Sequence, residues 1–180
     1  MDRPEFYRFH NGQKAVLPFA TEEYEARLAG LRDIMELHGL DVIVLTSMHN
    51  VAYFSGFLYC AFGRPYGLVV TATDTVTISA GIDAGQPWRR CHGDNLTYTD
   101  WARDNFWRVV AHVAGTSKAI GVEADHLTMQ QAEKLNAFLK PARGIDIAPA
   151  TMQQRMIKSP AEIDLIRAGA AVADVGGYAI

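Results

Sequence analysis

Apolar residues recur at helical spacing early in the chain and then run together in a block typical of a buried strand. Thr21 can cap the predicted helix, and Gly39 can end it. The apolar face of this helix is formed by Tyr24, Leu28, Leu31 and Met35. Residues 42–46, VIVLT, have the continuous apolar character of a strand that is covered on both faces. The pattern therefore predicts a helix followed by a central strand.

Two further strands are predicted close together in the sequence. Residues 49–57 can form a short helix before them. The runs LVVTA, at 68–72, and TVTISA, at 75–80, flank Thr73 and Asp74 as the two strands of a hairpin would. We therefore expect the first part of the sheet to be mixed or antiparallel.

The second half of the chain alternates between strand and helix patterns. LTYT at 96–99 is a predicted strand, and Asp100 can cap a helix after it. The apolar face of that helix is formed by Phe106, Val109, Val110 and Val113.

The alternation then repeats. AIGVE at 119–123 is the next predicted strand, a helix capped by Thr128 and ended by Pro141 follows, and IDIA at 145–148 is the last strand. Alternation of this kind is typical of an α/β sheet with parallel pairings and helices on its faces. The fold class we expect is α/β, with three layers in which helices flank a mixed sheet.

The clearest helix start in the chain lies near its end. Ser159 is a capping serine, Pro160 stands at the first helical position, and Glu162 can close a capping box. The long helix predicted here continues almost to Ile180 without a basic last turn. We expect the sequence to be cut inside a longer polypeptide, although a natural end near residues 176–177 is the alternative.

Composition excludes several kinds of partner. The 180 residues are 49% hydrophobic and 21% charged, with a net charge of -3 and a pI near 6.0, so there is no basic field for nucleic acid. The amino-terminal stretch has no apolar core of a signal peptide, and no run of about 18 apolar residues occurs. We therefore expect a cytoplasmic protein that binds neither nucleic acid nor a membrane.

The sequence contains no recognisable metal or nucleotide motif. H-E-x-x-H, Cys-x-x-Cys, P-loop and G-x-G-x-x-G patterns are all missing, so no metal or other cofactor is expected. His49, His92 and His126 are read as surface or loop residues, because no orienting carboxylate is evident beside them. Cys60 and Cys91 are read as free buried thiols.

One charged residue stands in an otherwise uncharged stretch. Arg64 is the only Asp, Glu, Lys or Arg in residues 42–73, and a guanidinium in so apolar a setting needs an anion or water. Gly63 and Pro65 on either side of it favour a fixed turn. Arg64 either binds an anionic ligand, pairs with a carboxylate of its own domain, or lies on a solvated loop.

Aromatic residues near Arg64 favour the hypothesis that it binds an anionic ligand. Phe62 and Tyr66 can wall a planar group beside this arginine, whose two parallel N–H bonds would fix a carboxylate in position and angle. Trp88, Arg89 and Arg90 form a second group that can face an anion, but a role in ion pairs or at a subunit contact is equally compatible with the sequence.

Several blocks of the sequence resemble the amino-terminal domain of the creatinase family, the bacterial creatine amidinohydrolases. These blocks are TSMHNVAYFSGFLYCAFGRPYGLVVT, GIDAGQPWRRC, YTDWARDN, IGVEADHL and RMIKSPAEIDLIRAGA. They cover nearly the whole chain. AFGRPY together with QPWRR is the part that separates creatinases from the aminopeptidases and prolidases with the same two-domain architecture.

The resemblance implies a homodimeric hydrolase that converts creatine and water to sarcosine and urea without a metal. Residues 1–158 would be the amino-terminal domain, and residues 159–180 would begin the first helix of a carboxy-terminal catalytic domain that this sequence lacks. The domain would reach across the dimer, where Phe62 walls the substrate and Arg64 binds its carboxylate. This chain alone would then not be catalytic.

Two other readings stay open. The parent protein could be a metal-dependent Xaa-Pro aminopeptidase or prolidase, in which Arg64 serves a peptide carboxylate or only the structure. The chain could also be a stand-alone module that binds a small molecule or assists assembly. The residues that follow Ile180 would distinguish the first two, and ligand binding by the isolated chain would test the third.

Overall fold

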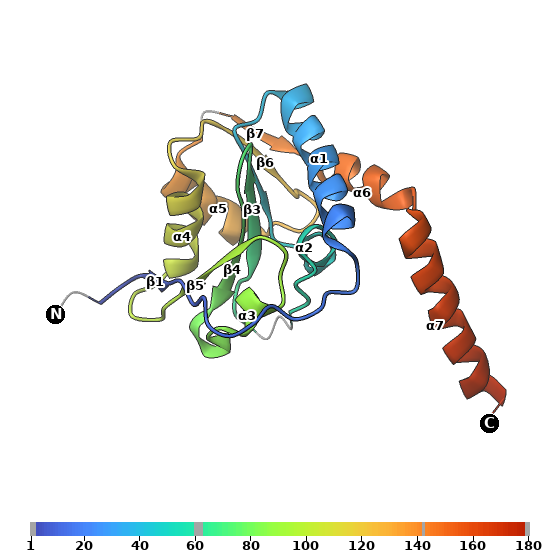
Figure 1. Ribbon diagram of the computed structural model, residues 1–180. Coiled ribbons are helices and arrows are strands. Elements are labelled where there is room, and N and C mark those ends of the chain that lie inside the picture. Colours follow the sequence, from blue (N-terminus) through green and yellow to red (C-terminus); the bar gives the residue numbers. More distant parts are fainter. Residues whose placement is uncertain (1–2, 60–62, 142, 179–180) are drawn as a thin grey trace.

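A mixed sheet between two layers of helices forms the body of the molecule (Figure 1). The computed structural model describes residues 3–59, 63–141 and 143–178. The strands are β1 (Phe6–Tyr7), β2 (Val42–Leu45), β3 (Gly67–Thr71), β4 (Thr75–Ala80), β5 (Asp94–Tyr98), β6 (Ala119–Val122) and β7 (Arg143–Asp146). The helices are α1 (Thr21–His38), α2 (Met48–Ser55), α3 (Gln86–Arg89), α4 (Asn105–Ala114), α5 (Met129–Leu139), α6 (Ala148–Met156) and α7 (Pro160–Tyr178), with a 3₁₀ turn at Gly81–Asp83. The predicted three-layer α/β class is confirmed.

The sheet has the order β1-β5-β4-β3-β2-β6-β7. β3 pairs antiparallel with β2 and β4, and β1 pairs antiparallel with β5. The pairs β4–β5, β2–β6 and β6–β7 are parallel. The prediction of an antiparallel hairpin first and parallel pairings later is therefore confirmed.

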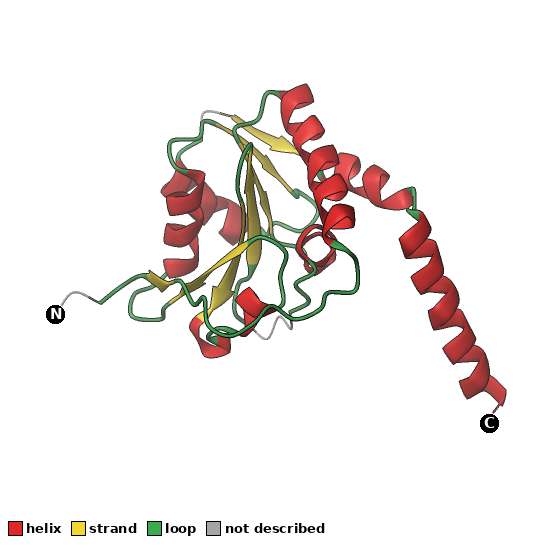
Figure 2. Cartoon of the chain, in the orientation of Figure 1, coloured by secondary structure: helices red, strands yellow, loops and turns green. Residues whose placement is uncertain are grey.

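The two faces of the sheet carry different helices. α4 packs on β3, β4 and β5 and also contacts α5, while α1, α2 and α6 lie on the opposite face (Figure 2). The central strands are apolar on both faces because helices cover both, and Ile43, Leu45 and Leu68 have no exposed surface. Each such side chain contributes about 1.5–3 kcal/mol through burial.

Helix boundaries follow local capping chemistry. α1 ends at Gly39 in the left-handed conformation (φ 58°), as predicted, but begins after Ala20, so that Thr21 is its first residue and not its cap. Thr128 and Gln131 form a capping box at α5. Ser159 caps α7 in the same way, because its amide donates to Glu162 at 2.9 Å and the Glu162 amide donates back to its hydroxyl at 3.2 Å.

One expectation for the second half is wrong, and the bounds of another differ. Asp100 does not cap a helix: residues 100–104 form a turn, and α4 begins at Asn105 after Asp104 adopts φ 63°. The predicted last strand is present but lies at 143–146 instead of 145–148, and a helix that was not predicted begins at Ala148.

The Asp146 side chain accounts for the position of this last boundary. It accepts hydrogen bonds from the amides of Ala124, at 3.1 Å, and Ala148, at 2.9 Å. The second of these bonds satisfies a free amide at the start of α6, so the strand gives way to a helix there.

α7 projects away from the body of the molecule (Figure 1). None of its described residues is buried, and Leu165, Ile166, Val172 and Val175 are all exposed. Its first turn is tied to the domain through Glu162, whose carboxylate lies 3.4 Å from the buried Arg27 guanidinium. Among the described helices, none is long and apolar enough to cross a lipid bilayer.

Candidate functional site

Arg64 lies on the turn between α2 and β3, beside Gly63, whose φ is 74°. Its Nη1 donates a hydrogen bond of 2.5 Å to Asp100 Oδ2. The side chains are 39% and 56% exposed, respectively. This hydrogen bond and the charge of Asp100 raise the pKa of Arg64. Of the sequence alternatives, a carboxylate partner within the same chain is thus present in the structure.

The pair with Asp100 leaves most of the Arg64 guanidinium available. An exposed ion pair contributes about 0–1 kcal/mol, because water screens both charges. A guanidinium also has five N–H donors, and this hydrogen bond to Asp100 occupies one of them. Arg64 can therefore still bind a carboxylate through a second edge.

Arg64 and Arg90 line one cavity of about 420 Å³. The apolar part of its lining consists of Phe57, Leu58, Tyr59, Tyr66, Ile82 and Pro87. Asp83 is the one carboxylate among the described lining residues, and it already accepts a hydrogen bond from the Tyr66 hydroxyl. The cavity therefore presents two guanidinium groups beside an apolar wall, one of them paired with Asp100 at its edge.

The wall is built from stacked tyrosines. The rings of Tyr59 and Tyr66 lie 4.5 Å apart at 18° to each other. The Tyr59 hydroxyl donates to the Thr46 carbonyl at 2.8 Å. Burial, and secondarily the charge of Glu123, raise the pKa of Tyr59 to about 12, and burial with the Asp83 hydrogen bond raises the pKa of Tyr66. Both phenols are therefore neutral near neutral pH and offer a planar, uncharged surface.

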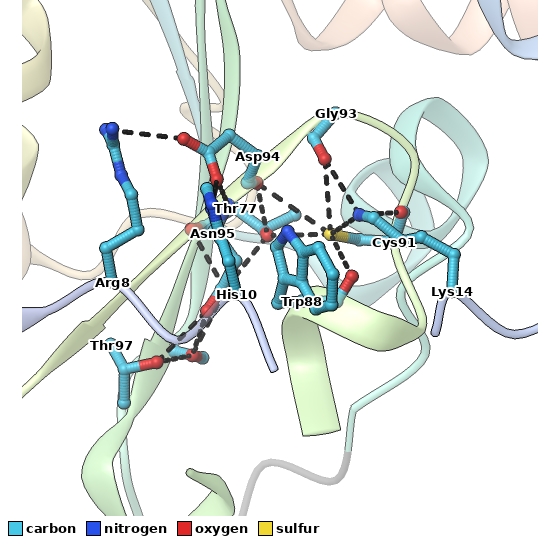
Figure 3. A network of polar contacts seen from close by, with 11 residues as sticks. Arg8, His10, Lys14, Thr77, Trp88, Cys91, Gly93, Asp94, Asn95 and Thr97 are labelled. Carbon is cyan, nitrogen blue, oxygen red and sulfur yellow. Dashed lines mark hydrogen bonds and ion pairs between the residues drawn. The ribbon is translucent and has the colours of Figure 1, made fainter. Parts of the chain in front are cut away.

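The amino-terminal segment holds α3 in place beside this cavity (Figure 3). The Trp88 ring stacks on His10, with 5.0 Å between ring centres, and Lys14 Nζ lies 4.8 Å from the same ring. The Arg89 carbonyl accepts a hydrogen bond of 2.7 Å from the Ala15 amide. In the group Trp88, Arg89 and Arg90 (the WRR cluster), Trp88 and the Arg89 backbone therefore make structural contacts, and Arg90 lines the cavity.

The amino-terminal segment also contacts Asp94 and Cys91 (Figure 3). Asp94 contacts Arg8 at 3.3 Å and His10 at 2.6 Å, while Lys14 donates to the Cys91 carbonyl at 2.9 Å. Burial raises the pKa of the Cys91 thiol, which is free, as predicted. Cys60 lies outside the described residues.

A buried polar ladder lies under α3, on β4 and β5. Asn95 donates to the Thr77 carbonyl at 3.1 Å and to the Ser79 hydroxyl at 3.2 Å, and the Thr97 hydroxyl donates to Asn95 Oδ1 at 3.0 Å (Figure 3). All four residues are fully buried. Because their polar groups are paired with one another, this face of the sheet is polar without an unsatisfied group at Asn95.

Glu123 is a positioning residue that the sequence reading did not single out. It is 2% exposed and accepts hydrogen bonds from the amides of Thr46, at 2.6 Å, and Ser47, at 2.9 Å. It also accepts from Asn50 Nδ2 at 2.7 Å and from the Ser47 hydroxyl. The carboxylate therefore fixes the β2–α2 turn, whose Thr46 carbonyl in turn holds Tyr59.

The three histidines considered from the sequence lie away from the Arg64 cavity. His49 is exposed, and His126 Nδ1 lies 3.0 Å from the Thr46 hydroxyl. His92 stacks on Tyr24, with 5.4 Å between ring centres, and burial lowers its pKa. Within the described ranges, no group of three His, Cys, Asp or Glu side chains is placed to hold a metal ion.

Phe62, the other predicted binding residue, lies outside the described residues. Its role as a wall for the substrate stays a prediction. The described cavity supplies Tyr59 and Tyr66 as aromatic surfaces near Arg64.

Comparison with known proteins places this chain in a family. The family model Creatinase/Prolidase N-terminal domain matches residues 27–157. The chain is 44% identical over 175 residues to a creatinase from a Bacillus species, covering 95% of this chain and 43% of that protein. It is 29% identical over 166 residues to the ectoine hydrolase of Halomonas elongata, covering 84% of this chain and 42% of that protein.

Solved structures share the fold at low sequence identity. The Xaa-Pro dipeptidase from Bacillus anthracis superposes with a TM-score of 0.70 at 19% identity, covering 84% of this chain and 41% of that chain. The Creatinase/Prolidase N-terminal domain of an X-Pro dipeptidase from Streptococcus pyogenes gives 0.64 at 18% identity, covering 71% of this chain and 98% of that chain.

The fold defines a class of α/β domains that recurs in these hydrolases. This chain belongs to the Creatinase/Prolidase N-terminal domain family. It spans less than half the length of the curated relatives named above.

Proposed function

We propose that this chain is the substrate-orienting, dimer-forming amino-terminal domain of a creatinase, a hydrolase that converts creatine and water to sarcosine and urea. Residues 1–158 form that domain, and residues from 159 onward begin the catalytic domain. The observation that carries the proposal is the aromatic-walled cavity lined by Arg64 and Arg90 in a chain 44% identical to a creatinase. The parent protein is cytoplasmic, and its reaction needs no cofactor.

The chemistry of creatine matches the described side chains. Creatine has a carboxylate at one end and a planar cationic guanidinium at the other. Arg64 can bind the carboxylate through two parallel N–H bonds, which fix both its position and its angle. An aromatic face, Tyr59 or the predicted Phe62, can pack along the planar part of the molecule. The domain thus contributes orientation, and the bond-breaking groups come from the catalytic domain of the partner subunit.

The second arginine supports the same assignment. Arg90 has no hydrogen-bond or ion-pair partner for its side chain among the described residues, and it lines the same cavity as Arg64. Its charge favours the acid end of a zwitterion at this end of the cavity and disfavours the cationic end. Creatine would therefore enter with its guanidinium pointing away from both arginines.

A metal-dependent dipeptidase is the second candidate, because the structural neighbours include Xaa-Pro dipeptidases. Such an enzyme would also need to recognise a carboxylate, that of the dipeptide. It would require carboxylate and histidine ligands in the part of the protein that follows this chain. A stand-alone binding module is the third candidate.

One substrate comparison separates the candidates. The protein with the residues that follow Ile180 is assayed on creatine and on an Ala-Pro dipeptide, with and without a metal chelator. Urea release from creatine that survives chelation supports the proposal, whereas chelator-sensitive dipeptide cleavage without urea release supports the dipeptidase. Calorimetry on the 180-residue chain completes the set, because creatine binding by this chain alone, at millimolar affinity or tighter, would favour a complete site and the stand-alone module.

A further inference from the structure

Arg64 also lines a second cavity, of about 670 Å³, on the side of the sheet that carries α4. Tyr98, Asp100 and Asn105 are among its lining residues. Two of these residues have a buried polar atom without a hydrogen-bond partner in the described part of the chain: the Tyr98 hydroxyl and Asn105 Oδ1. Buried polar groups are nearly always paired, so the unpaired Tyr98 hydroxyl beside Arg64 requires an explanation.

The Tyr98 hydroxyl lies at the end of β5 that faces Arg64. Tyr98 is 4% exposed, and its ring makes an edge contact with Phe106, with 5.9 Å between ring centres. Burial raises the pKa of Tyr98 to about 12, and the positive charge of Arg64 opposes this rise. The phenol is therefore uncharged and lies beside the guanidinium, near enough for a polar contact that lowers its pKa, but the two groups are not within hydrogen-bond distance and angle.

Asp100 follows two residues after Tyr98 and contacts the same guanidinium. Its Oδ2 accepts the hydrogen bond of 2.5 Å from Arg64 Nη1. Among the described side chains, Asp100 alone meets the distance and angle of a hydrogen bond or ion pair with Arg64, while the Tyr98 hydroxyl lies near enough to raise its pKa. Two groups near the end of β5 therefore lie beside Arg64: the Asp100 carboxylate, which accepts a hydrogen bond from it, and the Tyr98 hydroxyl, which does not.

We propose that Asp100 and Tyr98 are positioning residues for Arg64, which hold the two N–H groups of its Nη1 and leave its Nε and Nη2 edge for a ligand carboxylate. The Asp100 bond is present without ligand, and the Tyr98 bond forms when the guanidinium rotates to meet the ligand. The inference rests on the proposed function, since it assigns to Arg64 the carboxylate-binding role. The inference explains why the buried Tyr98 hydroxyl has no hydrogen bond without ligand: the Arg64 guanidinium rotates into hydrogen-bond geometry when the ligand binds.

The motion of the Arg64 side chain tests the Asp100 contact without substrate. Relaxation of the arginine Nε–H groups is measured by NMR in the 180-residue chain, in the wild type, in Asp100→Asn and in Glu5→Gln. Glu5 is the matched control, because its pair with Arg108 has similar exposure, 48% and 43%. Asp100→Asn is expected to lower the Arg64 order parameter below about 0.6. Glu5→Gln should leave Arg64 unchanged. An Arg64 order parameter that Asp100→Asn does not alter overturns the inference.

Kinetics test the Tyr98 contact. In the protein that carries the catalytic domain, Tyr98→Phe should raise KM for creatine about tenfold, since a bond to a charged group is lost. Asp100→Asn should raise KM about three- to fivefold, Asp100→Glu should recover part of the loss, and kcat should change less than about twofold. Tyr98→Phe should leave the thermal midpoint unchanged or raise it, because it removes an unpaired buried hydroxyl.

The reference variant is Arg64→Ala. If Arg64→Ala raises KM but Tyr98→Phe and Asp100→Asn do not, the inference is overturned and the proposed function stands. If Arg64→Ala leaves KM unchanged in an active enzyme, both are overturned. A lower thermal midpoint in Tyr98→Phe with unchanged KM assigns the hydroxyl to folding alone and also overturns the inference.

Discussion

The Glu123 carboxylate accepts a hydrogen bond of 2.6 Å from the Thr46 amide, across 77 residues of sequence. The two residues follow the parallel strands β6 and β2, which pair side by side in the sheet. Thr46 then offers its carbonyl to the Tyr59 hydroxyl. The tyrosine wall of the Arg64 cavity is therefore anchored to a buried carboxylate on a neighbouring strand end.

Removal of the charge from Glu123 should destabilise the domain. Glu123→Gln keeps the size of the side chain but places an amide NH₂ where the carboxylate accepts bonds from donors. We expect a loss of about 2–4 kcal/mol in the free energy of unfolding, measured by urea denaturation. Glu133→Gln on the exposed face of α5 is the control and should change this free energy by less than about 0.5 kcal/mol. Equal effects of the two variants would show that the Glu123 network is not important for stability.

α7 should be dispensable for the stability of the domain. A chain that ends after Arg167 keeps the first two turns of α7, with the capping box and the contact with Arg27, but lacks the rest of the projecting, unburied helix. Because that part buries no side chain, we expect the thermal midpoint to change by less than about 2 °C. Circular dichroism melts of both chains provide the measurement. Loss of cooperative melting in the shorter chain would contradict the proposed domain division.

Alkaline pH should weaken the fold. Burial raises the pKa of Tyr59 and Tyr98 from 10.0 to about 12, and the pKa values of Tyr66 and Cys91 are also raised. These groups lose protons first in the unfolded chain, so the native state holds more protons and the free energy of unfolding falls as pH rises. The stability is complete below about pH 8 and is lost progressively between about pH 9 and 12. Urea denaturation at a series of pH values measures it, and a flat or rising profile across that window would refute the prediction.

Arg90 should assist binding through charge rather than through a fixed contact. Arg90→Ala is expected to raise KM for creatine about two- to fivefold at low ionic strength, and less at high salt, because the side chain is exposed and screened. Arg89→Ala is the matched control, since Arg89 does not line the cavity. If the two variants have the same effect, or if the effect of Arg90→Ala does not depend on salt, the electrostatic role is excluded.

The sequence predicted most of the fold because local and global signals agreed. The continuous apolar run at 42–46 favoured a strand covered on both faces, and Ser159 with Glu162 carried the complete chemistry of a helix start. Asp100 was misread because its side chain has the properties of a cap, but its partner is Arg64, 36 residues away. A hydrogen bond between residues so far apart in the sequence cannot be predicted from local residue spacing.

The candidate site was predictable only in part for the same reason. Arg64 stood out because it interrupts an apolar stretch, and Arg90 was noted in the WRR cluster, but nothing in the sequence placed the two in one cavity. Glu123 was read as the last residue of a strand. An acidic residue directly after a buried strand nevertheless indicates a buried carboxylate that needs hydrogen-bond donors. The unpaired state of the Tyr98 hydroxyl could be recognised only from the burial and the hydrogen bonds in the structure.

The most direct test of the account is steady-state kinetics of Arg64→Ala and Arg64→Lys in the protein that carries the catalytic domain. Loss of the carboxylate contact should raise KM for creatine at least about tenfold in Arg64→Ala, and Arg64→Lys should recover only part of it, because a lysine cannot form two parallel bonds. A Michaelis constant for creatine that is the same in wild type and Arg64→Ala would contradict the central claim.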